Sequence, residues 1–157
     1  MAQTEERALK VQSSYEFDIS QGELWRLLND PEVLASTIPG VKSFTPAGPN
    51  HYQATMNVGI GPVRGSYQGA VQVTDQDPPN AYTLKVEGKG PGAFINGSGR
   101  ITLSAETSDK TRVDVEGDAQ VGGVLARVGQ RMIGNASKSI IRQFFDNVKK
   151  RAKQQAS

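Results

Sequence analysis

Apolar and polar residues alternate in several stretches of the first 121 residues, and apolar residues then recur at helical spacing. Alternation with a period of two is typical of half-buried strands, and recurrence every three or four residues is typical of an amphipathic helix. No proline occurs from about Val124 to Lys153. The pattern therefore predicts one long C-terminal helix, with this apolar stripe: Leu125, Val128, Met132, Ile133, Ala136, Ile140, Ile141, Phe144, Phe145 and Val148.

Seven stretches before this helix have the strand pattern, and short turns rich in Gly, Pro, Asn and Asp separate most of them. Such short links favour antiparallel neighbours. The predicted strands are 9–19, 41–45, 51–58, 63–74, 81–87, 94–105 and 111–121.

Two short helices are predicted between the first and second strands. Ser20 and Glu23 have the spacing of a capping box, which indicates a helix start at Ser20. A second helix is predicted to begin after Asn29 or Asp30, with Pro31 in a favourable first position. The fold class is therefore α+β, a curved antiparallel sheet whose apolar face only the long helix is able to cover.

Glycines at predicted inward positions suggest that space is kept between the sheet and the helix. They lie at strand positions 65, 69, 88 and 117, and at 122, 123, 129 and 134 around the start of the helix. Glycine inside a helix costs about 1 kcal/mol relative to alanine, so its presence there favours a need for room. We expect an apolar cavity that binds an apolar ligand, and the alternative is simply close packing of helix on sheet.

Composition excludes several kinds of chemistry. The chain has 157 residues and no cysteine, so thiol catalysis, disulfides and thiolate metal sites are absent. His51 is the one histidine and begins a predicted strand, and Asp114, Glu116 and Asp118 share the polar face of another strand. We therefore expect no catalytic residue, no metal and no covalent cofactor. No apolar run approaches the roughly 20 residues of a membrane span.

Charge is unevenly distributed although the net charge is only +2. Residues from Gln120 onward carry about +7, and the rest of the chain about −5. Such a basic segment is typical of contact with an acidic membrane surface or partner, or it complements the dipole of its own helix. Nucleic-acid binding is not favoured, because the aromatic residues nearby fit the apolar stripe of the helix better.

Three local strings resemble the CoxG family of carbon monoxide dehydrogenase subunits, which belongs to the START-like, helix-grip superfamily. They are Leu28-Asn-Asp-Pro-Glu-Val-Leu34 followed by Ile38-Pro-Gly40, then Val58-Gly-Ile-Gly-Pro-Val-Arg-Gly65, and Val86-Glu-Gly-Lys-Gly-Pro-Gly-Ala-Phe94. The resemblance runs from about Leu9 to Lys150. It implies a seven-stranded antiparallel sheet that grips the C-terminal helix around a hydrophobic cavity.

The resemblance also implies a partner and a location. The partner is a molybdenum hydroxylase of the carbon monoxide dehydrogenase type, which the protein helps to attach to the inner face of the cytoplasmic membrane. We interpret residues 1–8 as a flexible lead, 9–148 as the START-like domain and 149–157 as a basic tail. The residues expected to contact the membrane or partner are Phe144, Phe145, Lys149, Lys150, Arg151 and Lys153.

The interpretation that follows is a non-catalytic accessory protein that binds a hydrophobic ligand. A respiratory quinone or a lipid is the candidate ligand, since a carbon monoxide dehydrogenase must pass electrons to the respiratory chain. The expected lining residues are Met56, Val58, Ile60, Tyr67, Leu84, Val86, Phe94, Leu125, Val128 and Met132.

Two alternatives stay open. One is a ligand-free adaptor that bridges the enzyme and the membrane. The other is a START-like enzyme such as a cyclase, which needs polar groups in the cavity. Tyr67, Tyr82 and Asn96 are the candidates for that role.

Overall fold

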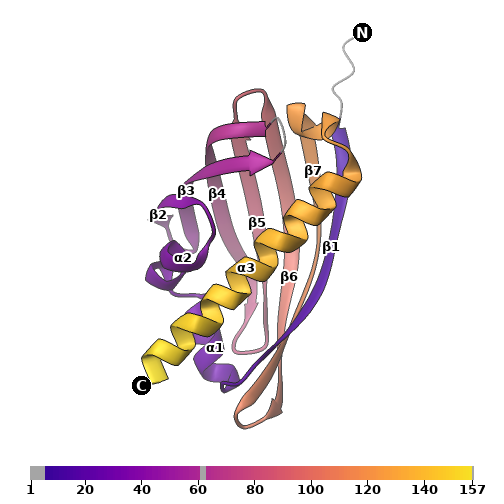
Figure 1. Ribbon diagram of the computed structural model, residues 1–157. Coiled ribbons are helices and arrows are strands. Elements are labelled where there is room, and N and C mark those ends of the chain that lie inside the picture. The colour runs from indigo at the N-terminus through magenta and orange to yellow at the C-terminus, as the bar shows by residue number, and fades with distance from the viewer. Residues whose placement is uncertain (1–5, 61–62, 157) are drawn as a thin grey trace.

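The computed structural model describes residues 6–60 and 63–156 (Figure 1). Seven antiparallel strands form one curved sheet, and a long helix crosses its inner face, which confirms the predicted fold class. The strand order in space is β1-β7-β6-β5-β4-β3-β2. The elements are β1 (Glu6–Phe17), α1 (Gln21–Leu28), α2 (Pro31–Thr37), β2 (Val41–Gly48), β3 (His51–Ile60), β4 (Val63–Asp77), β5 (Ala81–Gly90), β6 (Ala93–Thr107), β7 (Lys110–Gly123), a 3₁₀ turn η1 (Val124–Arg127) and α3 (Gln130–Ala156).

The two short helices begin where their capping residues predict. The Ser20 hydroxyl accepts a hydrogen bond from the Glu23 amide at 3.3 Å, which satisfies an otherwise unpaired donor of the first turn of α1. The Asp30 carboxylate accepts one from the Glu32 amide at 2.9 Å, and Pro31 opens α2. These helices carry the chain from β1 at one edge of the sheet to β2 at the other.

Several strands are longer than the turn signals predict. β2 continues through Pro46, which pairs with Tyr52 of β3. β2 is an edge strand, where the missing amide hydrogen of a proline is tolerated. β5 likewise runs on through Gly90, so the predicted flexible corner at 88–92 is reduced to a turn at Pro91 and Gly92.

The long helix begins later than predicted. Residues Val124–Arg127 form the 3₁₀ turn η1, and α3 starts at Gln130. Gly123 and Gly129 have positive φ angles of 66° and 40° on either side of this turn. Glycine adopts such angles readily, so the two glycines let the chain turn twice before the regular helix begins.

The apolar core consists of two separate main clusters. The lower cluster in the view of Figure 1 lies beside α1, and the upper cluster lies beside η1. The members of the lower cluster are Phe17, Leu24, Leu28, Val73, Tyr82, Ile101, Leu103, Val113, Phe145 and Val148, and those of the upper cluster are Tyr67, Ala93, Val121, Leu125, Ala126, Val128 and Ile133. A small third cluster of Leu27, Val33 and Ala152 joins α1, α2 and α3.

The orientation of α3 can be tested with two truncations of apolar side chains. Phe145 is 2% exposed and Met132 is 50% exposed. Phe145→Ala is expected to lower the free energy of unfolding by about 3–5 kcal/mol, because it leaves a cavity in the lower cluster. Met132→Ala is expected to change it by no more than about 0.5 kcal/mol. Urea denaturation measures both, and similar losses in the two variants would contradict this orientation.

Candidate ligand-binding site

The candidate site is the middle of the inner sheet face, beneath α3. The helix backbone comes near β1 and, to a smaller extent, β3, but hardly near β4–β7. Helix α3 therefore bridges the curved sheet from one side to the other, as Figure 1 shows. The two main core clusters lie toward the two ends of this bridge.

A belt of glycines occupies the inner face between the two clusters. Gly69 of β4 pairs with Gly88 of β5, and Gly99 of β6 pairs with Gly117 of β7. Gly97 of β6 has the same orientation, because it lies two residues before Gly99. Residues on the same face of adjacent strands are neighbours, so these positions form a continuous strip without side chains.

The helix leaves space above this belt. A Cβ atom built on Gly69, Gly88 or Gly99 would meet only atoms of adjacent strands within 4 Å, and no described atom of α3. A Cβ atom built on Gly134 of α3 would meet nothing within 4 Å. Close packing of helix on sheet, the alternative reason for the glycines, therefore does not apply at these four positions.

Apolar side chains beside the belt are only half-buried. Met56, Val71, Val86 and Ala119 have the inward orientation but keep part of their surface accessible. Inward residues near the two ends of the sheet, such as Val113, are fully buried. The middle of the inner face is thus apolar and incompletely covered.

The structure also contains two polar hollows away from this face. One of about 240 Å³ lies between α2 and α3, lined by Ser36, Thr37, Asn147, Lys150, Arg151 and Gln154. The other, of about 430 Å³, lies over β2–β5 on the outer sheet face, where Gln53, Gln68 and Glu87 contribute side chains. Neither is the apolar cavity expected from the sequence, so an enclosed cavity under α3 stays a prediction.

Most of the predicted lining residues lie on the inner face. Tyr67, Leu125 and Val128 belong to the upper cluster, and Val58 packs against it. Leu84 packs against the lower cluster. Met56 and Val86 lie between the two clusters, beside the glycine belt. The side chain of Ile60 lies outside the described residues.

Two predicted lining residues point elsewhere. Met132 is exposed, because the neighbouring Ile133 is the residue of α3 that packs into the upper cluster. Phe94 pairs with Gly122, and its ring lies over that glycine on the outer sheet face. Its neighbours Ala93 and Ile95 are the inward residues of β6 at this point. Both predictions are therefore wrong.

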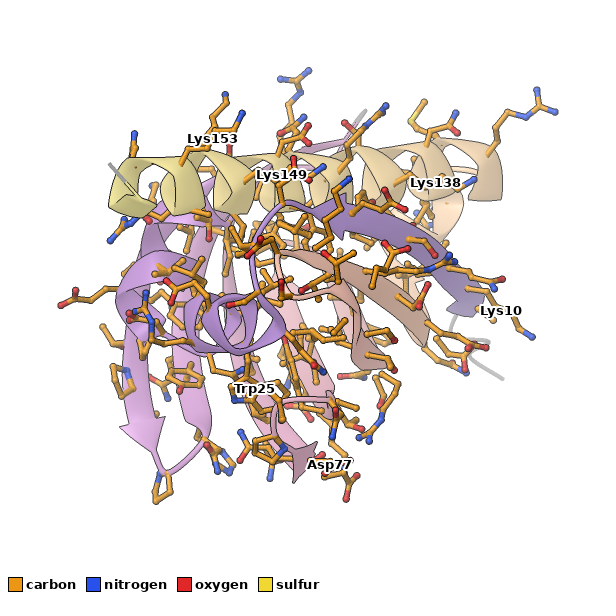
Figure 2. The ribbon with its side chains drawn as sticks, turned by 90° about the horizontal axis from the view of Figure 1, so that it is seen from below. Lys10, Trp25, Asp77, Lys138, Lys149 and Lys153 are labelled. Carbon is orange, nitrogen blue, oxygen red and sulfur yellow. The ribbon has the colours of Figure 1, made fainter. Side chains whose placement is uncertain are left out.

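The predicted membrane-contact residues also divide. Phe145 is buried, with its ring centroid 4.5 Å from that of Tyr15, so its predicted membrane contact is wrong. Phe144 is half-buried against the same cluster. Residues 149–156 continue α3, and Lys149 places its ammonium 5.3 Å from the ring centroid of Phe17. Lys150 and Lys153 are exposed. Figure 2 shows labelled lysines spread along the helix.

Tyr67 is the most informative polar group on the inner face. Its ring covers Gly90, and its hydroxyl is buried without a hydrogen-bond partner. Burial raises the pKa of this hydroxyl above its ordinary value, so the group is a neutral donor at physiological pH. Of the other polar candidates, Tyr82 is buried in the lower cluster and Asn96 is exposed on the outer face.

Known proteins resemble this chain in sequence and in fold. The profile of CoxG, a subunit of carbon monoxide dehydrogenase, matches residues 14–153. The chain belongs to this family. Membership of the CoxG family, together with a START-like fold, indicates a ligand-binding accessory protein. No curated protein matches the chain significantly.

Solved structures agree with this assignment. A conserved protein from Geobacillus kaustophilus is 36% identical, with a TM-score of 0.90 over 93% of this chain and 96% of that one. A START superfamily protein from Mycobacterium smegmatis is 14% identical, with a TM-score of 0.74 over 93% and 98%. The Zhui aromatase/cyclase from Streptomyces sp. R1128 is 12% identical, with a TM-score of 0.70 over 96% and 97%. The last two show the shared fold alone.

Two kinds of feature are absent from the part of the chain that the structure describes. No helix in that part is long and apolar enough to cross a membrane. Nor do three or more His, Asp or Glu side chains within residues 6–60 and 63–156 come together as a metal site would require.

The space above the glycine belt can be tested with a matched pair of substitutions. A Cβ atom at Gly99 would have its nearest contact at 3.6 Å, whereas one at Gly117 would lie 2.7 Å from the Ser98 carbonyl oxygen. Gly99→Ala is therefore expected to raise the free energy of unfolding by about 0.4–1 kcal/mol through the unfolded state. Gly117→Ala is expected to lower it by about 1–3 kcal/mol through overpacking. Thermal or urea unfolding would show the opposite signs, and equal losses would contradict the proposed space.

Proposed function

We propose that this protein is a non-catalytic accessory protein that binds a hydrophobic ligand between α3 and the inner sheet face. The observation that carries the proposal is the glycine belt beneath a helix that does not reach it. Leaving apolar side chains accessible there costs about 25 cal/mol for each Å² that is not buried. A ligand that covers them recovers this energy, which accounts for an otherwise unfavourable arrangement.

The ligand we propose is a respiratory quinone. Its isoprenoid tail matches the apolar middle of the inner face, and its ring carbonyls are hydrogen-bond acceptors. Tyr67 offers a buried hydroxyl that has no partner among the protein groups. Leaving such a donor unpaired costs about 1–3 kcal/mol, and a carbonyl oxygen would satisfy it. A ligand that combines a carbonyl head with an apolar tail therefore fits both features.

The partner we propose is a molybdenum hydroxylase of the carbon monoxide dehydrogenase type, because the family is named as a subunit of that enzyme. A quinone carrier beside such an enzyme would receive its electrons. We further propose that the protein holds the enzyme at the inner face of the cytoplasmic membrane. The basic residues of α3 support this role, since each cation near an anionic surface contributes about 1 kcal/mol.

Ligand binding can be followed through the single tryptophan. Trp25 packs edge-on to Tyr82, with ring centroids 5.3 Å apart, and borders the lower cluster beside the belt. Decylubiquinone is expected to quench its fluorescence in a saturable way. Gly99→Phe fills the space above the belt and is expected to weaken this affinity at least tenfold. Met132→Phe adds the same ring at an exposed position and should leave the affinity unchanged.

Two results would contradict ligand binding under α3. One is an unchanged decylubiquinone affinity in a folded Gly99→Phe variant. The other is an organic extract of the purified protein that contains no quinone or polyisoprenoid, even after incubation with membranes. Together they would favour the ligand-free adaptor.

The role of Tyr67 generates a prediction with two opposite signs. Tyr67→Phe removes the buried, unpaired hydroxyl, so the ligand-free variant is expected to be more stable than the parent protein by about 1 kcal/mol. The same change is expected to weaken decylubiquinone binding by about 3–10-fold, since a hydrogen bond contributes about 0.5–1.5 kcal/mol. Unfolding and fluorescence titration measure the two effects. A variant that loses both stability and affinity would show that the hydroxyl is already satisfied within the protein.

A further inference from the structure

The hollow between α2 and α3 is a second candidate site, distinct from the inner sheet face. It measures about 240 Å³ and lies between the end of α2 and the last turns of α3. The segments that form it are more than 100 residues apart in the sequence. Pockets for drug-sized ligands measure about 300–1,000 Å³, so this hollow fits a smaller group than a quinone.

Specific contacts hold the walls of the hollow in place. The Asn147 amide donates to the Thr37 carbonyl oxygen at 3.0 Å, and the Arg151 guanidinium donates to the Ser36 hydroxyl at 2.9 Å. The hydroxyls of Ser36 and Thr37 in turn donate to the Val33 carbonyl oxygen, at 2.9 and 2.7 Å. Beneath them, the third cluster of the core joins α2 to α3. The guanidinium of Arg151 is therefore oriented before any ligand arrives.

The lining of the hollow is positively charged. Lys150 and Arg151 contribute two cations, and no carboxylate is among its lining residues. Within residues 6–60 and 63–156, neither cation forms an ion pair. Cations in the last turns also complement the dipole of α3. That effect alone requires no hollow and no fixed guanidinium, and Lys153 supplies it as well.

We propose that this hollow binds a phosphate group, carried by a molecule of about the size of glycerol phosphate. A guanidinium presents several donors in a planar fork that matches phosphate oxygens, and an ammonium adds a compact charge beside it. The remaining amide hydrogens of Asn147 are available to the same anion. The phosphate has two chemical sources, the headgroup of an anionic phospholipid or a soluble phosphate ester. The site does not depend on a ligand under α3.

A set of four variants, each lacking one positive charge, separates a defined site from general positive charge. Lys150→Gln and Arg151→Gln each remove a cation of the hollow. Lys138→Gln and Lys153→Gln remove the same charge from exposed positions of α3 outside its lining. Binding of glycerol 3-phosphate is measured by calorimetry on the full chain at low salt. We expect the first pair to weaken it at least tenfold and the second pair less than twofold.

Two controls keep the result interpretable. Arg151→Lys retains the charge but loses the fork, so an intermediate loss is expected, whereas the charge alone would predict none. Lys150→Gln tests the site even if Arg151→Gln loosens α2, because the contact between Arg151 and Ser36 is kept in that variant. Quenching of Trp25 by decylubiquinone should be unchanged in all these variants, which keeps failure of this site distinct from failure of the proposed quinone site.

Vesicles of phosphatidylcholine with one third phosphatidylglycerol identify the source of the phosphate. Loss of vesicle binding in Lys150→Gln and Arg151→Gln, with smaller losses in the control pair, would support a lipid headgroup. Equal vesicle losses in all four variants, with glycerol 3-phosphate binding still selective, would support a soluble phosphate ester. The proposal is overturned if glycerol 3-phosphate does not bind, or if all four variants weaken its binding equally.

Discussion

A single helix has to cover the inner face of a seven-stranded sheet, and it is too narrow to do so. Strands about 4.8 Å apart make such a sheet roughly 29 Å wide, whereas a helix with its side chains is about 10–12 Å across. Curvature lets α3 reach β1 and β3 on the two sides. The short helices cover one end and η1 the other, so only the middle strands keep an accessible apolar face. The glycine belt and the half-buried side chains around it follow from this limit.

Local sequence signals were sufficient for the elements but not always for the face of a side chain. The capping residues Ser20 and Asp30 located the starts of α1 and α2. Phe94 lies on the face opposite to the predicted one, because a shift of one residue in a strand moves every side chain to the other side. Ile101 and Leu103 have the opposite parity to Phe94 and are buried, and the inward glycines of β6 belong to the same series. That parity was the available signal for the missed glycines.

The remaining errors arise from contacts that no local pattern contains. The late start of α3 fixes Ile133 rather than Met132 toward the upper cluster, and the positive φ angles responsible belong to Gly123 and Gly129. Phe145 packs on two aromatic rings of β1, which precedes it by more than 120 residues. The hollow between α2 and α3 likewise depends on two distant segments. Periodicity identifies an apolar stripe, but only tertiary packing decides which part of its margin meets solvent.

The pairing of β1 with β7 has a consequence for how the chain is made. Glu6 lies opposite Gly122, so the first strand of the sheet to leave the ribosome has to wait for the last strand to be translated. Until then, Leu9, Val11 and Tyr15 have no neighbour in the sheet. Contacts between such distant residues give a high contact order, which slows folding to milliseconds or longer. Assembly is therefore nearly post-translational, and the nascent N-terminal strand is the segment that most needs protection by chaperones.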